Sequence, residues 1–255
     1  MQPPQSPYNQ PNFGQPQQPY APQPQGPRGT VSLDVIGEAW KLLTANTGTW
    51  VPAGLIYFAA SALFSLLQRS LQAVGPNGIP RNTPGSLIVA LVSLFVTSFL
   101  AAGLMMKMAL SAVSGAKAEL SQLGSGGNVF LSLIVANILI GLAIVIGLAF
   151  CIVPGLIAAA GLMLVAPLVV SGQGAFAALS ASWGALSKHL GSAVVLAIVL
   201  GLIVIVSLIP FGLGLIISIP LLQLSLALLY RDLFGAGAGA QNMGYTPPPI
   251  ANPNF

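Results

Sequence analysis

Six long apolar runs restrict the structures that this chain can form more than any other feature of its sequence. They cover residues 50–67, 87–106, 129–153, 156–170, 192–209 and 213–230. A helix needs about 20 apolar residues to cross roughly 30 Å of hydrocarbon, and unpaired backbone groups are costly in lipid. We therefore predict an all-α integral membrane protein with six transmembrane helices.

The composition excludes an ordinary soluble enzyme. Hydrophobic residues make up 55% of the chain and charged residues only 5%, whereas an average soluble protein has about 25% charged residues. The net charge of +4 is too small for a nucleic-acid-binding surface, although it can orient the chain in a bilayer. Membrane lipids are therefore the expected partners, and binding to nucleic acid is not expected.

Two polar segments flank the apolar region and divide the chain into three parts. Residues 1–30 are mostly Gln and Pro, which predicts a disordered tail with polyproline II character. Residues 235–255, rich in Gly and Pro, predict a second disordered tail, and 31–234 form the membrane domain. We interpret the first tail as a solvated segment without a partner; the alternative is that the tails contact membrane or cytoplasmic protein partners.

The third and fourth apolar runs are separated only by Pro154-Gly155. Proline ends a helix and glycine permits a sharp turn, so this pair predicts a helical hairpin. The alternative is a single bent or re-entrant unit, because the fourth run is shorter than the usual minimum of about 17 residues. Pro167 is expected to interrupt the fourth helix further along.

The basic residues predict the orientation of the six helices. An even number of crossings puts both chain ends on one side of the membrane, and two basic residues, Arg69 and Arg81, fall on the other side. The remaining six then fall on the side of the ends: Arg28, Lys41, Lys107, Lys117, Lys188 and Arg231. This bias predicts cytoplasmic termini. Lys107 follows the second run directly, and we interpret it as an interfacial anchor.

A helix with two distinct faces precedes the first apolar run. Its apolar face has the spacing of a helix and comprises Leu33, Ile36, Trp40 and Leu43, while Asp34, Glu38 and Lys41 occupy the other face. We expect this helix to lie in the headgroup plane, with Trp40 as its interfacial anchor.

A second such helix is predicted over 175–189, before the fifth run, with Trp183 as its interfacial anchor. Aligning Trp40 with Trp183 places Leu43 over Leu186 and Asn46 over His189. Each copy precedes a transmembrane hairpin on the same predicted side. The alignment therefore predicts a duplicated unit, consisting of a surface helix and two spans.

The sequence contains no recognisable catalytic chemistry. The four acids, Asp34, Glu38, Glu119 and Asp232, are expected at or outside the interface without forming a catalytic pair. The single histidine, His189, and the single cysteine, Cys151, are too few ligands for a zinc site. We therefore expect no catalytic, cofactor-binding or metal site.

Two amides, Asn137 and Gln223, are the notable polar side chains inside the apolar runs. A buried amide in lipid usually forms a hydrogen bond across a helix interface, with an average contribution of about 0.6 kcal/mol. The alternative is that they line a cavity for a solute together with Ser207 and Ser218. No acid or base is expected within the membrane, which argues against ion-coupled transport.

Several segments together resemble a known family. They are the Pro/Gln-rich tail, Gly37 to Trp40, the block FCIVPGLIAAAGLMLVAPLVV at 150–170, the block GQGAFAALSASWGALSKH at 172–189, and a Pro-turn hairpin ending in Tyr230-Arg231. Over about 31–234 the chain resembles uncharacterised bacterial six-span proteins, which are related to the membrane domain of some glycerophosphoryl diester phosphodiesterases. The resemblance implies this fold and a bacterial cytoplasmic membrane. It does not imply phosphodiesterase activity, because the chain has no hydrophilic catalytic domain.

These observations favour a non-catalytic membrane protein that acts as a scaffold, an assembly factor or an envelope-organising component. The second hypothesis is a transporter or permease for a neutral or amphiphilic solute. A membrane-embedded enzyme is the third and has the least support from the residues.

Overall fold

The computed structural model describes residues 28–75, 77–115, 127–150 and 152–235. Within these residues, six helical segments are long and apolar enough to cross a membrane, which confirms the predicted number. They are Thr47–Ser70, Pro84–Val113, Phe130–Gly147, Ile152–Val170, Ala175–Leu208 and Leu215–Phe234. The predicted tails, apart from their residues 28–30 and 235, lie outside the described residues, as do Lys117, Glu119 and Cys151.

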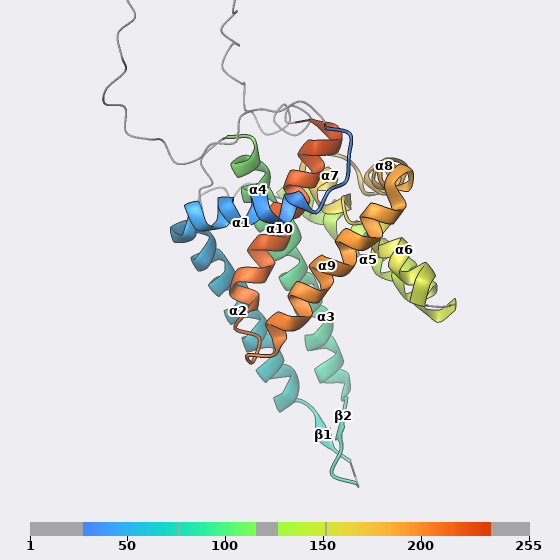
Figure 1. Ribbon diagram of the computed structural model, residues 1–255. Helices are drawn as coiled ribbons and strands as arrows, with labels where there is room; N and C mark the ends of the chain where they lie inside the picture. Colours follow the sequence, from blue (N-terminus) through green and yellow to red (C-terminus); the bar gives the residue numbers. More distant parts are fainter. Residues whose placement is uncertain (1–27, 76, 116–126, 151, 236–255) are drawn as a thin grey trace, which may run out of the picture.

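The elements in chain order are α1 (Asp34–Ala45), α2 (Thr47–Ser70), β1 (Ala73–Val74), β2 (Pro80–Arg81), α3 (Pro84–Ser98), the π-helix η1 (Phe99–Met105), α4 (Met106–Val113), α5 (Gly127–Phe150), α6 (Ile152–Gly161), α7 (Val165–Val170), α8 (Ala175–Leu186), the 3₁₀ turn η3 (Ser187–His189), α9 (Leu190–Leu208) and α10 (Leu215–Phe234). They form three hairpins, α2–α3, α5–α6 and α9–α10. Helices α1 and α8 lie across one end of these hairpins, and β1 and β2 lie at the other end (Figure 1).

The turn of the first hairpin contains the only strands in the described residues. Strands β1 and β2 pair antiparallel over two residues each, a feature that the sequence did not predict. Helix α3 then begins with a capping box: the Thr83 hydroxyl accepts from the Ser86 N–H and the Ser86 hydroxyl accepts from the Thr83 N–H. Pro84 follows as the first helical residue, where its missing N–H costs nothing.

The second hairpin is built on a close backbone contact. A Cβ added to Gly147 on α5 would lie 2.9 Å from the backbone of Gly155 on α6, so the predicted helical hairpin is present. Its turn comes earlier than expected, because α5 ends at Phe150 and α6 begins at Ile152. Pro154 lies within the first turn of α6, where the lack of an N–H is tolerated.

The fourth span is divided at a position that the sequence did not predict. Residues 162–164 form turns between α6 and α7, so the interruption precedes Pro167 instead of falling on it. Pro167 is the third residue of α7, and α-helices accept proline in their first turn. The segment consists of two short helices in place of one continuous helix.

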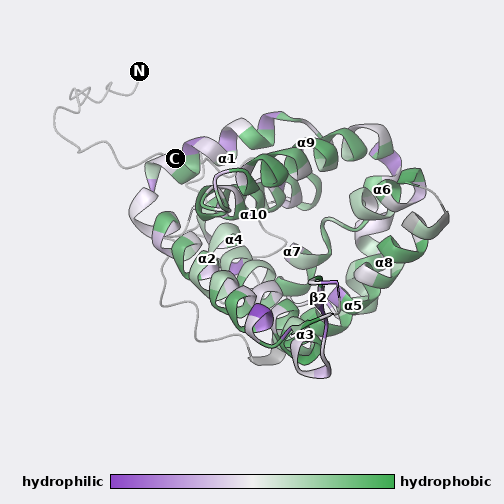
Figure 2. Cartoon of the chain, turned by 90° about the horizontal axis from the view of Figure 1, so that it is seen from below, coloured by the Kyte–Doolittle hydropathy of each residue, from purple (hydrophilic) through white to green (hydrophobic). Residues whose placement is uncertain are grey.

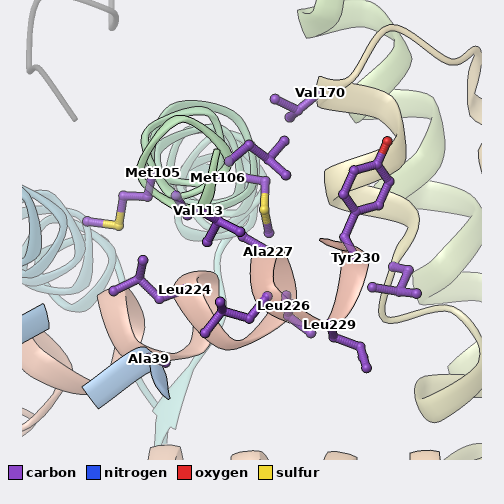
Figure 3. Close-up of a cluster of buried hydrophobic side chains, with 14 of the residues drawn as sticks. Ala39, Met105, Met106, Val113, Val170, Leu224, Leu226, Ala227, Leu229 and Tyr230 are labelled. Atoms are coloured by element: carbon purple, nitrogen blue, oxygen red, sulfur yellow. The ribbon is translucent and has the colours of Figure 1, made fainter. Parts of the chain in front are cut away.

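Helix α10 is the structural centre. In the most apolar stretch of 18 residues within α10, 78% of the residues are buried. In the corresponding stretch of the segment formed by α3, η1 and α4, only 6% are buried. Helix α10 packs against α1, α2, α4 and α9. Figure 3 shows Leu224, Ala227 and Tyr230 of α10 beside Met105 and Met106. The long helices consist mainly of hydrophobic residues (Figure 2). Helices α2, α3, α5 and α9 expose many large apolar side chains, as expected of surfaces that face lipid.

Helix α1 packs on the protein through a face that overlaps the predicted apolar face only in part. The buried residues are Val35, Ala39, Leu42 and Leu43, whereas Leu33 and Trp40 of the predicted apolar face are exposed. Glu38, expected on the polar face, forms an ion pair with Arg231 of α10. Of the predicted apolar face, Leu43 is buried and Ile36 is partly buried against the core, and the predicted headgroup contact of Trp40 remains a prediction.

Helices α1 and α8 have the same pattern of burial in the alignment that pairs Trp40 with Trp183. Each residue from 33 to 41 is buried, half-buried or exposed like its counterpart from 176 to 184. Buried residues continue in register into the spans, where Trp50 corresponds to Ala193 and Ala53 to Leu196. The two copies nevertheless pack on different helices, α1 on α10 and α8 on α7. The burial pattern thus agrees with the predicted duplication.

Candidate functional site

Four charged side chains form a closed ring where α1 crosses the end of α10; we call it the charge ring. Arg231 Nη2 lies 2.9 Å from Glu38 Oε2 and 2.8 Å from Asp232 Oδ1. Arg28 Nη1 lies 3.0 Å from Glu38 Oε1 and 3.8 Å from Asp232 Oδ2. Each arginine thus contacts both carboxylates, and the charges alternate in sign around the ring.

The charge ring extends from the protein interior to the surface. The side chains of Arg231 and Asp232 are 3% and 4% exposed, those of Glu38 and Arg28 24% and 38%. Two buried charges lose most of their hydration, and they are tolerated because each faces opposite charge at hydrogen-bonding distance. The buried half of the ring therefore depends on its partners more than the exposed half does.

The ring keeps Glu38 ionised. Partial burial by itself would raise the pKa of the Glu38 carboxyl, but hydrogen bonds from Arg231 and Arg28 outweigh it and hold the pKa below the usual 4.5. The hydrogen bond to Glu38 in turn raises the pKa of the Arg28 guanidinium. Glu38 and Arg28 are therefore both charged throughout the neutral range.

The ring also joins the two places where the tails leave the membrane domain. The Gly29 N–H donates a hydrogen bond to the Asp232 carbonyl oxygen over 2.9 Å, which links the residues before α1 to the last turn of α10. Gly29 has φ +65°, a conformation that glycine adopts without strain. Both chain ends of the domain thus lie together, as an even number of crossings requires.

The sequence did not reveal this ring. Glu38 was expected on a solvated face, and Arg231 was expected only to contribute to the positive charge that orients the chain in the membrane. Pairing between residues at opposite ends of a chain leaves no local spacing to detect. The one available signal was the adjacent Arg231-Asp232 at the end of an apolar run, where uncompensated charge is costly.

The two intramembrane amides do not form a common site. Asn137 is half-buried on α5, which packs against α6, α7 and α8, whereas Gln223 is buried on α10. The hydroxyl of Ser207 donates to the Ile203 carbonyl within its own helix, and the Ser218 hydroxyl is buried without a partner in the described residues. The polar residues suggested for one cavity are therefore distributed over several interfaces.

Gln223 is buried on α10, and Trp50 is buried on α2, which packs against α10. The two helices come so close at Gly54 that an added Cβ would overlap the Ile216 carbonyl. Trp50 Nε1, a donor, and Gln223 Oε1, an acceptor, are buried and have no partner among the described residues.

The predicted interfacial anchors have different surroundings. Trp40 is 49% exposed on α1 and Trp183 is 43% exposed on α8. Trp183 also covers Gly161, since a Cβ added there would lie 2.5 Å from its ring. Lys107 is half-buried inside the continuous segment formed by α3, η1 and α4, six residues before its end at Val113. The anchoring roles themselves remain predictions.

A small apolar pocket of about 50 Å³ lies between α2 and the segment formed by η1 and α4. The π-helix η1 supplies three of its lining residues, and π-helical turns are frequent at functional sites. The lining residues are Ala53, Ile56, Tyr57, Leu100, Leu104, Met105 and Met108. Such a lining suits a hydrocarbon chain and offers at most one hydroxyl to a polar group.

Among the described residues, no group of three or more His, Cys, Asp or Glu side chains could hold a metal ion. Comparison with known proteins finds no matching family model, curated protein or solved structure. The resemblance to the membrane domain of glycerophosphoryl diester phosphodiesterases thus remains a prediction.

Proposed function

We propose that this chain is a non-catalytic scaffold or assembly component of the bacterial cytoplasmic membrane. The supporting observation is the charge ring together with the hydrogen bond from Gly29 to Asp232. These contacts use four of the few charged side chains to hold a surface helix and both tail attachment points at one place. Two tails that leave from one point can bind the same partner, which raises the effective concentration of the second contact.

The proposal includes an orientation. The six basic residues assigned from the sequence to the side of the tails favour the cytoplasm for that side. The α1 and α8 helices would then face cytoplasmic partners, with Trp40 and Trp183 at the headgroups.

Crosslinking and mass spectrometry on native membranes test the scaffold function. We expect one partner to be captured by the full chain and lost on deletion of residues 1–27 and, separately, of residues 236–255. As a control, Asp34→Asn changes an exposed acid outside the charge ring and should retain the partner. Unchanged capture by both deletion variants would contradict a scaffold that works through its tails.

A permease for a neutral or amphiphilic solute is the second candidate. The apolar pocket and the unpartnered Trp50 Nε1 and Gln223 Oε1 favour it, because they offer an apolar surface and polar atoms within the spans. Its test is solute flux in liposomes with the purified protein. Flux of a defined solute that is abolished by Gln223→Leu would replace the scaffold proposal with this one.

A further inference from the structure

The two hairpin turns farthest from α1 and α8 in the described residues differ in chemistry. The turn between α2 and α3 is flanked by Arg69 and contains Arg81, and its Gln72 amide donates to Asn82 over 3.1 Å. The turn between α9 and α10, residues 209–214, has the sequence IPFGLG and no polar side chain. Polar side chains suit the first turn to water, whereas nothing in the second favours water.

The apolar side chains of the α9–α10 turn are directed outward. Phe211 is 97% exposed and Ile209 is 78% exposed. Among the described large apolar side chains, these are the highest and the joint second-highest values. Phe211 has φ +54° and Gly212 φ +78°. Two successive left-handed residues reverse the chain, and the first is strained because it is not glycine. The strained turn thus places an aromatic ring at the tip of the hairpin.

The backbone of this turn is hydrogen-bonded within itself. Pro210 brings no N–H group, and four of the other five N–H groups of the turn donate to carbonyls within four residues: Ile209 to Val206, Phe211 to Ile209, Gly212 to Leu208 and Leu213 to Pro210. Backbone in hydrocarbon must satisfy its polar groups internally. Both the side chains and the backbone of the turn therefore suit an apolar medium.

The helices of this hairpin are also no longer than the hydrocarbon layer is thick. Helix α9 has 19 residues, which rise about 28 Å, less than the roughly 30 Å of hydrocarbon even without tilt. In Figure 1, α9 is strongly inclined and the tip of α9–α10 lies short of β1 and β2. Helix α2, with 24 residues, extends farther in the same direction.

We propose that the α9–α10 turn ends inside the membrane, with Ile209, Phe211 and Leu213 among the acyl chains of the leaflet farther from α1 and α8. Of the two turns, only the α2–α3 turn reaches the aqueous phase on the side of the membrane farther from α1 and α8. Phe211 is then a lipid contact, and α9–α10 is a hairpin inserted from one side.

Spin labels on single cysteines test this placement in liposomes. In a Cys151→Ser background, Phe211→Cys places the label at the tip and Ile79→Cys, in the α2–α3 turn and 63% exposed in the wild type, is the matched control. Oxygen partitions into lipid and a nickel chelate into water. We expect the ratio of oxygen to nickel collisions to exceed one at 211 and to fall below one at 79.

Two results would overturn the proposal. Nickel accessibility at 211 equal to that at 79 would place the tip in water. Low accessibility to both reagents at 211 would mean that protein covers it, either a partner or a second copy. Leu213→Cys, at a neighbouring exposed position, gives the same readout if the Phe211→Cys chain does not fold.

Discussion

The backbones of Asn46 and His189 adopt the same conformation, with φ −130° and ψ 42° at the first and φ −131° and ψ 33° at the second. Each residue joins a surface helix to the span that follows it. The alignment of Trp40 with Trp183 superimposes these two joints, as it does the burial patterns of α1 and α8. The identical joints support the predicted duplication at the level of the backbone.

The two joints should respond alike to substitution. Proline fixes φ near −65°, so Asn46→Pro and His189→Pro each conflict with the native angle and should destabilise the protein by about 1 kcal/mol or more. The exchanges Asn46→His and His189→Asn keep the angle accessible and should change the free energy of unfolding by less than about 0.5 kcal/mol. Thermal unfolding in detergent measures both. A loss of stability in only one of the two proline variants would argue against equivalent joints.

The charge ring makes the docking of α1 dependent on pH. The folded pKa of Glu38 is lower than its usual 4.5, so its contribution is fully present above pH 4.5 and is lost as the pH falls through the lowered value. Hydrogen exchange of the α1 amides should therefore be constant from neutral pH to about pH 5, after correction for the intrinsic rate, and should show less protection in more acid solution.

Neutralising Glu38 should remove that dependence. Glu38→Gln loses the charged partner of the buried Arg231 and should cost about 1.5–3 kcal/mol of unfolding free energy at neutral pH, the range for hydrogen bonds to charged groups. Asp34→Asn, on an exposed part of α1, is the control and should retain the wild-type profile. A Glu38→Gln protein that still loses α1 protection below pH 4.5 would show that another group controls the docking.

Gly54 allows α2 and α10 to touch. Gly54→Ala places a methyl group against the Ile216 carbonyl, which is backbone and cannot move aside, so we expect a loss of about 1–3 kcal/mol. Gly141→Ala on α5 is the matched control, since nothing lies within 4 Å of its added Cβ. It should be neutral or stabilise by about 0.4–1 kcal/mol. Equal unfolding temperatures for the two variants would contradict the close approach.

The contact between Gly161 and Trp183 should appear as a coupling between two substitutions. Gly161→Ala alone pushes the Trp183 ring away from its site and should destabilise the protein. In a Trp183→Ala background the added methyl group has no ring to displace, so the destabilisation caused by Gly161→Ala should disappear. A double-mutant cycle on unfolding free energies measures the difference. An additive cycle would mean that Trp183 serves only as a membrane anchor.

The number and approximate position of the spans were predictable because lipid requires a long apolar run for every crossing, although the second span extends to Val113 instead of ending at Met106. The six runs and the bounds of α8 with η3 follow from hydrophobicity and helical periodicity alone. The duplication was visible in a short alignment around Trp40 and Trp183. Each of these features can be recognised from short stretches of sequence.

Three features were missed. The ion pair between Glu38 and Arg231 was not predicted, because no local pattern indicates a partner at the other end of the chain. The interruption at 162–164 falls before Pro167, since proline fits the first turn of the next helix and so does not mark the break itself. The π-helical turn η1 occurs within an unbroken apolar run, where hydropathy has no feature to distinguish it.

We propose that the chain crosses the membrane an even number of times and keeps both tails in the cytoplasm. This topology is tested by labelling spheroplasts with a membrane-impermeant maleimide, with single cysteines introduced by Gln10→Cys, Gln241→Cys and Ile79→Cys in the Cys151→Ser background. We expect labelling at 79 in intact spheroplasts and at 10 and 241 only after lysis. Labelling of one tail position but not the other before lysis would contradict it.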